Sequence, residues 1–323
     1  MTLLALALMA SIVTDTPRAW TSFRGNPQNS GTTSATVALP LRQSWSIVLD
    51  GPIEATAAIK DGFGYVGTTT GSLYKIRLSD RHVEWRFRSP SAFSSSPTLA
   101  DGSVFLGDEG GVFYSVDAST GRQRWKYQTG DKIVSSGSIL GDAVVFGSYD
   151  GRATCLLRSN GHRKWVYTTQ APIHGTPAVT PYGVVVAGCD GHAHLLRTTN
   201  GKQIAAFAIG TNVAASPAVM GTMVYVASIS AQYTAIDLMH RKIVWKEAER
   251  EEGAACHAGA SFADGLVMFG SRSRRVFAVD SRTGVGKWTF RTKEAVDSAP
   301  VVAGKVAFFG CDDGFFYAVR ASD

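Results

Sequence analysis

Short runs of apolar residues alternate with turn residues along nearly the whole chain. The stretch 93–132, FSSSPTLADGSVFLGDEGGVFYSVDASTGRQRWKYQTGDK, shows the pattern in full. An Asp-Gly turn at 101–102 precedes the run VFLG, a second turn at 108–111 precedes VFYSVD, and a Thr-Gly pair precedes a last run around Trp125. Short runs rich in β-branched and aromatic residues, bounded by Gly, Asp and Ser, are typical of antiparallel strands joined by hairpins. The stretch therefore predicts four short strands.

This four-strand unit recurs along the chain. One tryptophan marks each repeat, at spacings of 40 residues, a multiple of 40, or 43, and Ala205 occupies the one vacant position. A fixed period near 40 with four strands per period is typical of propeller blades. The marker tryptophans are Trp45, Trp85, Trp125, Trp165, Trp245 and Trp288.

The repeats predict an all-β, seven-bladed propeller. Complete units begin near residues 53, 93, 133, 173, 213 and 256, and residues 296–319 supply only three strands of a further unit. The segment 42–48, RQSWSIV, matches the last strand of a repeat, and we expect this N-terminal strand to close the last blade and cover its edge. The predicted organisation is an irregular lead-in at 19–41 and one propeller domain at 42–323.

Composition narrows the class of protein further. The 323 residues are 45% hydrophobic and only 18% charged, with 34 glycines, which suits one domain built from strands and turns. The formal charge of +6 is spread along the chain, and its densest part, Arg272, Arg274 and Arg275, is interpreted as a solvated turn. Nothing combines a basic stripe with aromatic residues, so we expect no nucleic-acid partner.

The N-terminus carries an apolar run, LLALALMASIV, within residues 1–18. Its length suits the apolar region of a signal peptide and is too short to span a bilayer. We therefore expect an exported protein of the periplasm or cell envelope with no transmembrane span. The run lacks a preceding Lys or Arg, so a truncated or misassigned start and a cytoplasmic location stay open. The four cysteines fall in different repeats, and we expect free, mostly buried thiols.

The repeat resembles the pyrroloquinoline-quinone (PQQ) type, whose consensus ends in Ala-x-Asp-x-x-Thr-Gly-x-x-x-Trp. The segments SVDASTGRQRW (115–125) and AVDSRTGVGKW (278–288) carry it here. The lead-in WTSFRGNPQ (20–28) is similar to the stretch that opens many exported propellers of this group, including relatives of the outer-membrane assembly protein BamB. The resemblance implies a propeller fold, protein partners and a location in the cell envelope.

The marker tryptophans have a structural interpretation. The Thr-Gly pair makes the turn into the outermost strand, and the following indole is expected to lie against the neighbouring blade. Burying ~150–250 Å² of indole at ~25 cal/mol per Å² contributes roughly 4–6 kcal/mol as an upper bound. We therefore expect these side chains to dock blades on one another and not to bind substrate.

One register of the repeats predicts a ring of residues at the mouth of a central channel. Its members lie three positions before the Pro position of each repeat, and four of them are ionisable. Carboxylates and imidazoles that converge on a pore can hold a divalent cation or a small polar ligand, although such positions can also bind only water. The acidic segment 247–256 lies beside this ring in sequence. The candidate ligand-binding residues are Glu54, His174, His257 and Asp297.

The residues favour a non-catalytic binding or scaffolding module, expected to be a monomer with protein partners. The alternative is a small PQQ-dependent dehydrogenase or quinone-binding protein with PQQ and Ca²⁺. The resemblance implies adjacent cysteines for that quinone site, and no Cys-Cys pair occurs. A metal-dependent enzyme using the ring is a second alternative. No nucleophile or phosphate-loop motif is present, and His192 and His194 are interpreted as surface or packed side chains without a carboxylate partner.

Overall fold

The computed structural model describes residues 19–210, 212–249 and 254–323, whose regular secondary structure consists almost entirely of strands. The expected signal segment 1–18 lies outside the described residues, as do 250–253 of the acidic segment. The chain divides into two compact units: Ala38–Pro177 with the residues up to Pro27, and Gln28–Val37 with Ala178–Asp323. Among the described residues, no helix is long and apolar enough to cross a membrane.

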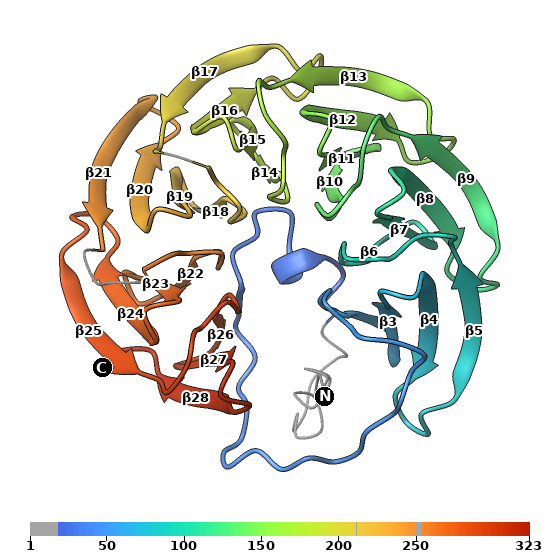
Figure 1. Cartoon of the computed structure of the whole chain (residues 1–323), viewed down its shortest axis with the longest axis horizontal. Coiled ribbons are helices and arrows are strands. Elements are labelled where there is room, and N and C mark those ends of the chain that lie inside the picture. Colours follow the sequence, from blue (N-terminus) through green and yellow to red (C-terminus); the bar gives the residue numbers. More distant parts are fainter. Residues whose placement is uncertain (1–18, 211, 250–253) are drawn as a thin grey trace. The chain divides into compact units, whose positions relative to one another are not determined.

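The first unit contains three four-stranded antiparallel sheets, each with its strands in chain order (Figure 1). The first blade comprises β2 (Ala58–Lys60), β3 (Phe63–Gly67), β4 (Ser72–Arg77) and β5 (Val83–Arg88). The second comprises β6 (Thr98–Ala100), β7 (Ser103–Gly107), β8 (Val112–Asp117) and β9 (Gln123–Gln128). The third comprises β10 (Ser138–Leu140), β11 (Ala143–Gly147), β12 (Arg152–Leu157) and β13 (Arg163–Thr168).

The second unit contains three further blades of this kind and a last blade of different make-up. The fourth comprises β14 (Ala178–Thr180), β15 (Gly183–Ala187), β16 (His192–Leu196) and β17 (Gln203–Ala208). The fifth comprises β18 (Ala218–Met220), β19 (Met223–Ala227), β20 (Gln232–Asp237) and β21 (Lys242–Ala248). The sixth comprises β22 (Ser261–Ala263), β23 (Leu266–Ser271), β24 (Arg275–Asp280) and β25 (Gly286–Arg291). Seven four-stranded sheets confirm the predicted class, an all-β seven-bladed propeller.

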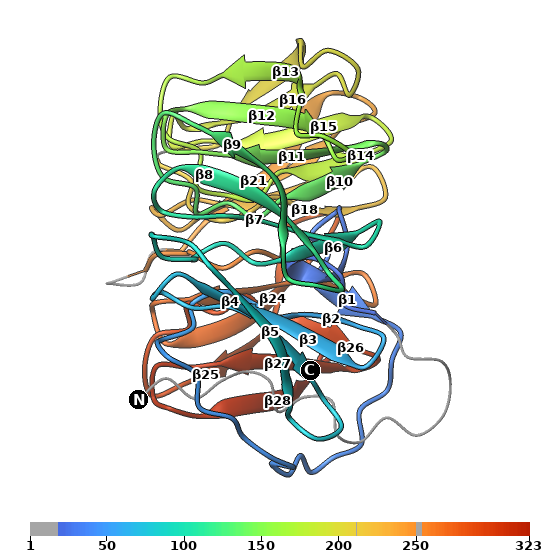
Figure 2. The same ribbon diagram turned by 90° about the vertical axis from the view of Figure 1, so that its right-hand side faces the viewer.

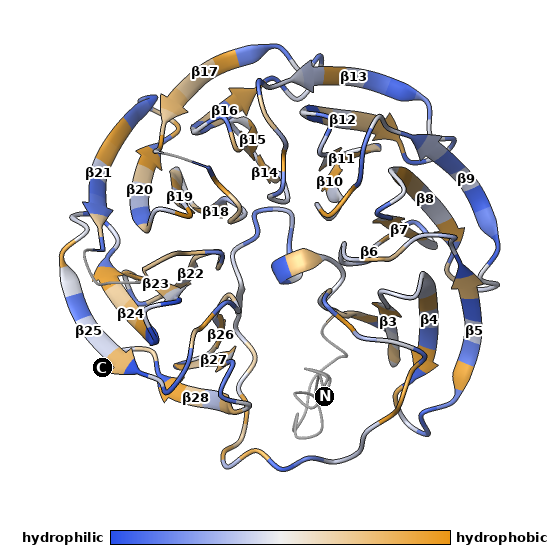
Figure 3. Ribbon diagram, viewed as in Figure 1, coloured by the Kyte–Doolittle hydropathy of each residue, from blue (hydrophilic) through white to orange (hydrophobic). Residues whose placement is uncertain are grey.

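Each blade grades from apolar inner strands to a half-exposed outer strand. Every residue of β7 is buried, whereas β9, with the sequence QRWKYQ, buries only its tryptophan fully. Figure 3 shows the same contrast, because β9 is largely hydrophilic and β8 largely hydrophobic. Middle strands packed on both faces need continuous apolar runs, whereas outer strands alternate because one face meets water.

The marker tryptophans lie against the following blade within each unit. Indole nitrogens of Trp85 and Trp125 donate hydrogen bonds to the carbonyl oxygens of Ala118 (3.2 Å) and Arg158 (2.8 Å). Each ring covers the glycine of the next blade's turn. A Cβ on Gly121 would come within 2.8 Å of the Trp85 ring, and its φ of +73° is itself unfavourable for other residues. The glycine of the motif therefore allows the turn and also leaves room for the indole ring to pack against it.

The last blade differs from the prediction. Its sheet contains β26 (Val301–Ala303), β27 (Val306–Gly310) and β28 (Phe316–Arg320), and its fourth strand is β1 (Thr32–Thr33). An N-terminal strand does complete the blade, but it lies at the inner edge of the sheet and pairs parallel to β26. Figure 2 labels β1 and the three other strands of this blade. The expectation that 42–48 forms the outermost strand is wrong.

Residues 42–48 form no strand. The apolar side chains at the end of this segment instead pack in the first unit, where Ile47 and Leu49 contact a cluster containing Val66, Tyr74 and Ile76. Alternating apolar residues favour a strand only when a partner edge is available. Here their burial is achieved by packing on the first blade, and Val48 between them is exposed. The pattern RQSWSIV was therefore insufficient to place the strand.

The lead-in follows the inner strands of both units. In the first unit Trp20 bridges to Ile59, and the Leu99 amide donates to the Thr21 carbonyl (2.7 Å). The short 3-10 helix η2 (Phe23–Gly25) follows, and its Arg24 is buried, which lowers the pKa of that guanidinium to about 9. In the second unit the Val219 and Val302 amides donate to the carbonyls of Gln28 and Gly31. Edge amides that a free inner strand would leave exposed are thus paired by the lead-in.

Candidate functional site

In the first unit, the predicted ring residue His174 contacts a hairpin, and the other, Glu54, contacts Ser94, which in turn contacts a hairpin. The Ser94 hydroxyl lies 3.2 Å from Glu54 Oε2 and 2.6 Å from Glu109 Oε1, so it can donate to one carboxylate at a time. His174 Nδ1 lies 2.7 Å from the Tyr149 hydroxyl, and the Lys132 ammonium lies 4.4 Å from the centre of the Tyr149 ring. The arrangement gives one acidic and one imidazole site on neighbouring blades.

The predicted ring residues of the second unit are brought together. His257 Nδ1 lies 3.9 Å from Asp297 Oδ1, and Arg272 Nε lies 3.6 Å from the same oxygen. That oxygen is buried and has no hydrogen-bond partner among the described residues. The three side chains are 37–46% exposed, so water screens their charges. The ring's two halves belong to different units, and convergence of Glu54 with Asp297 stays a prediction.

Sequence reasoning missed the partners that the hairpins contribute to this ring. Glu109, Tyr149 and Arg272 occupy one repeat position, the second residue of the turn between the second and third strands. Each backbone amide at this position donates to the carbonyl of the residue just before the start of its own repeat. For example, the Arg272 amide donates to the Ala255 carbonyl (3.0 Å). Aligning the repeats on Gly107, Gly147 and Gly270, two residues earlier, would have revealed this shared position. Among the described residues, no group of three or more His, Cys, Asp or Glu has a metal-binding arrangement.

The solvated-turn interpretation of the arginines is wrong for Arg275. Its guanidinium is 18% exposed and pairs at 2.9 Å with Glu249, whose side chain is 2% exposed. The hydroxyls of Tyr233 and Ser271 each donate to Glu249 Oε2 at 2.9 Å. A buried carboxylate is tolerated when it is paired and hydrogen-bonded in this way. This cluster joins the fifth and sixth blades, which gives Glu249 and Arg275 a structural role.

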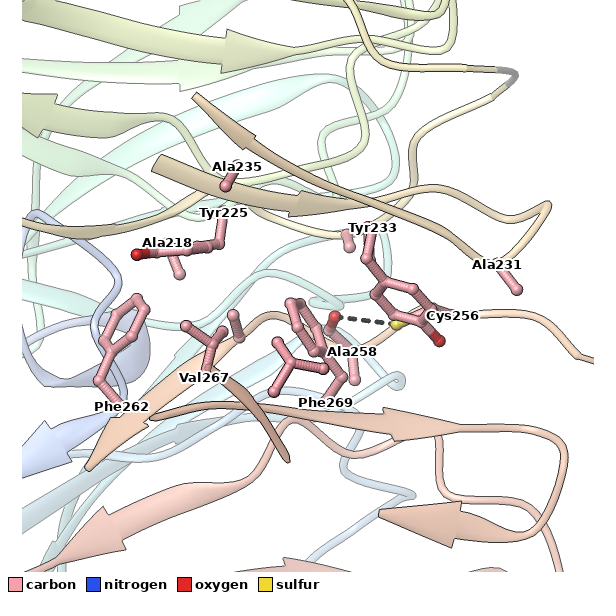
Figure 4. Close-up of a cluster of buried hydrophobic side chains, with 14 of the residues drawn as sticks. Ala218, Tyr225, Ala231, Tyr233, Ala235, Cys256, Ala258, Phe262, Val267 and Phe269 are labelled. Carbon is pink, nitrogen blue, oxygen red and sulfur yellow. Dashed lines mark hydrogen bonds between the residues drawn. The ribbon is translucent and has the colours of Figure 1, made fainter. Parts of the chain in front are cut away.

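Burial keeps Tyr233 of this cluster and the neighbouring Cys256 in their neutral forms. Cys256 donates from its thiol to the carbonyl of Ala258 (3.3 Å; Figure 4), and burial raises the pKa of the thiol to about 12. Burial likewise raises the pKa of Tyr233. All four cysteines are free thiols. A thiol with so high a pKa is a poor nucleophile, because the thiolate is the reactive form.

His194 is a packed residue, but the expectation that it lacks a carboxylate partner is wrong. Its side chain is 8% exposed, with Nε2 at 2.9 Å from Asp190 Oδ2 and Nδ1 at 3.1 Å from Gln203 Oε1. Asp190 lies in the turn just before the strand, four residues away. His192 Nδ1 lies 2.9 Å from the Asp190 carbonyl. These contacts give the pair a structural role within the fourth blade.

The remaining tryptophans divide between docked and undocked side chains. The indole nitrogens of Trp245 and Trp288 donate to the carbonyls of Ser281 (3.0 Å) and Ala321 (3.1 Å), and Trp165 is buried. Trp45 is half-buried in a segment without strand structure. At the vacant position, Ala205 packs with Ile204 and the buried Phe207.

The fold and repeat define a PQQ-type repeat propeller. A family model described as outer membrane protein assembly factor BamB matches residues 19–187 and 189–323, and the chain belongs to this family. No curated protein sequence matches the chain.

Three solved structures show how widely this fold is shared. BamB from Moraxella catarrhalis is 20% identical, with a TM-score of 0.75 over 86% of this chain and 87% of that one. A europium-containing methanol dehydrogenase is 14% identical, with a TM-score of 0.78 over 95% and 84%. The quinohemoprotein alcohol dehydrogenase of Comamonas testosteroni is 14% identical, with a TM-score of 0.79 over 94% and 72%. At these identities the likeness establishes the fold alone.

Proposed function

We propose that this chain is a non-catalytic propeller that binds other proteins in the cell envelope, in outer-membrane protein assembly or a related process. The observation that carries the proposal is the family match over nearly all the described residues. A BamB of similar extent, with 87% of its length covered, supports it. The proposal includes export of the chain and a monomeric state. Light scattering on the purified protein tests the monomeric state.

The last blade offers the surface best suited to a protein partner. Its outermost strand β28 pairs with β27 on one side and is the terminal strand of its sheet. Phe315 is 60% and Phe316 44% exposed, whereas Phe308 and Phe309 of the same blade are buried. Exposed aromatic side chains beside a strand edge favour an extended partner segment, which adds backbone hydrogen bonds and fills the apolar positions.

Capture of partners from an envelope fraction tests the proposal. The full chain carries an affinity tag and is cross-linked before solubilisation. We expect defined envelope proteins to copurify with the wild type and to be lost with Phe315→Ser combined with Phe316→Ser. The matched control is Val285→Ser, which removes a side chain of 60% exposure from another blade. Equal recovery by all three proteins, or recovery of none, would contradict the proposal.

The second candidate function is a small quinone-linked dehydrogenase. It is favoured by the two dehydrogenase structures, which share the fold over 95% and 94% of this chain. Titration with PQQ in the presence of calcium or europium, followed by a dye-linked alcohol oxidation assay, separates it from the binding module. Absorbance changes at stoichiometric PQQ together with turnover would replace the proposal by the enzyme.

A metal-dependent enzyme using the predicted ring is the third candidate. A cation held by Glu54, Asp297 and His257 would stabilise the fold by about 2.7 kcal/mol at a hundredfold excess over its dissociation constant. Thermal melts with calcium, magnesium, zinc and a chelator test this. A stabilisation abolished by Glu54→Gln with Asp297→Asn would support a metal site. Melts that do not respond to metal in the wild type exclude this candidate and leave the binding module unaffected.

A further inference from the structure

One repeat position carries a charge only in the first blade. This position lies on the third strand of each blade, opposite the tryptophan position of the fourth, as in the pairs Lys75–Trp85 and Ala235–Trp245. Five of its six other occupants are 0–1% exposed. Lysine is rarely placed among such residues without a partner. The other occupants are Ser115, Cys155, Leu195, Ala235, Ala278 and Ala318.

The Lys75 ammonium lies against aromatic rings and forms no ion pair with any described residue. Its Nζ is 4.1 Å from the centre of the Phe63 ring and 5.9 Å from that of Tyr65. The side chain is half-buried at the junction of the first and second blades. An ammonium held in an aromatic setting, with no carboxylate at salt-bridge distance, is available to an anion.

Tyr65 supplies a second unused polar group beside Lys75. The two residues are paired across β3 and β4, and Tyr65 is only 5% exposed. Its hydroxyl makes no hydrogen bond with a described residue. At the equivalent position in the fifth blade, the Tyr225 hydroxyl donates to the Ser281 carbonyl of the next blade at 3.1 Å. Burial and the nearby Asp61 raise the pKa of Tyr65 to about 12, so its hydroxyl stays a donor at neutral pH.

Both groups line a cavity of about 290 Å³ between the first and second blades. At about 30 Å³ per water, this is room for roughly ten waters. The walls are mainly apolar, formed by Phe63, Leu99 and Ala118. The charged residues that face it are Lys60, Lys75, Arg124 and Asp61, and Arg124 is already bonded to Asp117 at 2.6 Å.

We propose that this cavity binds a small carboxylate whose body is an aromatic or aliphatic ring. The carboxylate pairs with the Lys75 ammonium and accepts a hydrogen bond from the Tyr65 hydroxyl, while the ring lies against Phe63 and Leu99. One ammonium and one hydroxyl can pair with the two oxygens of a carboxylate. This proposal does not rest on the protein-binding surface proposed for the last blade.

Calorimetric titration of the full chain with three matched probes tests the proposal. Benzoate, benzamide and benzylamine share a ring and differ in charge. We expect benzoate to bind about tenfold more tightly than benzamide or benzylamine, which corresponds to ~1.4 kcal/mol. Lys75→Met keeps the apolar stem and should weaken benzoate binding about tenfold. Tyr65→Phe should weaken it about three- to tenfold, the range of one hydrogen bond.

Two control variants keep the test specific. Tyr225→Phe removes the hydroxyl already bonded to Ser281, and Lys164→Met removes an exposed lysine that pairs with Asp142 at 2.7 Å. Both should bind benzoate as the wild type does. Circular dichroism confirms that each variant is folded. The proposal is overturned if benzoate does not bind, if benzamide binds equally well, or if Lys75→Met binds benzoate unchanged.

Discussion

Two junctions between blades use the same repeat positions but differ in the hydrogen bonding of a tyrosine. At the junction of the fifth and sixth blades, Tyr225 and Trp245 both donate to the Ser281 carbonyl, and the Phe262 ring centre lies 5.3 Å from that of Tyr225 (Figure 4). At the junction of the first and second, Trp85 donates to the Ala118 carbonyl, but Tyr65 does not.

The difference lies at two side-chain positions. The junction of the fifth and sixth blades, here called the closed junction, has Ala235 and Phe262 at these positions. The junction of the first and second blades, the open junction, has Lys75 and Leu99. The smaller Leu99 leaves volume unfilled, and the Lys75 stem lies beside Tyr65. The repeat thus fixes the backbone and the docking of the indole, whereas side chains at the inner positions decide whether the tyrosine hydroxyl bonds to the next blade or lines a cavity.

Exchanging the charge between the two junctions should have the largest effect. Ala235→Lys places an ammonium at a position with 0% exposure, so overpacking and a buried unpaired charge should cost about 4 kcal/mol or more. Lys75→Ala should change the free energy of unfolding by less than about 1 kcal/mol. Urea unfolding of both variants measures this. A small loss in the free energy of unfolding for Ala235→Lys would contradict tight packing around Ala235 at the closed junction.

Removing the docked indoles should come next in size. Trp245 is 8% exposed, and Trp245→Ala should cost about 3–5 kcal/mol. Trp85 is only half-buried, and its ring centre lies 5.9 Å from that of Tyr65, which lines the cavity, so Trp85→Ala should cost less. The two free energies of unfolding are compared by denaturant titration. Equal losses would show that the cavity does not loosen the first junction.

Removing the hydroxyls should give a smaller difference. Tyr225→Phe deletes the hydrogen bond to Ser281 and should cost about 1 kcal/mol, because Trp245 still satisfies that carbonyl. Tyr65→Phe deletes no protein hydrogen bond and should change the free energy of unfolding by less than about 0.5 kcal/mol. Thermal melts at neutral pH make the comparison. A larger loss at Tyr65 would reverse the assignment of the two junctions.

The two tyrosines should also weaken the fold at alkaline pH. Burial raises the pKa of both Tyr65 and Tyr225 to about 12, whereas an unfolded tyrosine titrates near 10. Between these values the folded chain keeps protons that the unfolded chain releases, so their contribution is full below pH 10 and is lost as the pH rises to 12. Replacing both with Phe should flatten the alkaline decline. An unchanged slope in urea unfolding from pH 9 to 12 would contradict this.

Much of this architecture was predictable because a propeller repeat is a local pattern. The strand runs, the turn glycines and the tryptophan spacing all refer to neighbours within one repeat, and they located six complete blades. The course of the lead-in was not predictable. Asn29 bonds to the Pro217 carbonyl across 188 residues, and any extended backbone can accept hydrogen bonds from inner-strand amides. Side-chain pattern carries little information about such pairing, so 42–48 was assigned a strand that 32–33 forms.

The candidate sites were predictable to a similar extent. Register identified His257 and Asp297, which lie 3.9 Å apart, because equivalent positions of adjacent blades are neighbours. It did not identify Tyr149, nor Arg272, which was interpreted only as part of a solvated turn. The cavity at Lys75 was missed although its signal was present: a lysine opposite a marker tryptophan, where the other repeats have small or apolar residues.

A crystal structure of the full chain with para-iodobenzoate tests the central comparison most directly. Iodine gives an anomalous signal that locates the ring without interpretation of weak density. We predict a peak in the cavity between the first and second blades, with the carboxylate at hydrogen-bond distance from Lys75 Nζ and the Tyr65 hydroxyl, and no peak at the Tyr225 junction. Iodine at the Tyr225 junction, or an empty cavity beside Tyr65 at saturating probe, would contradict the account.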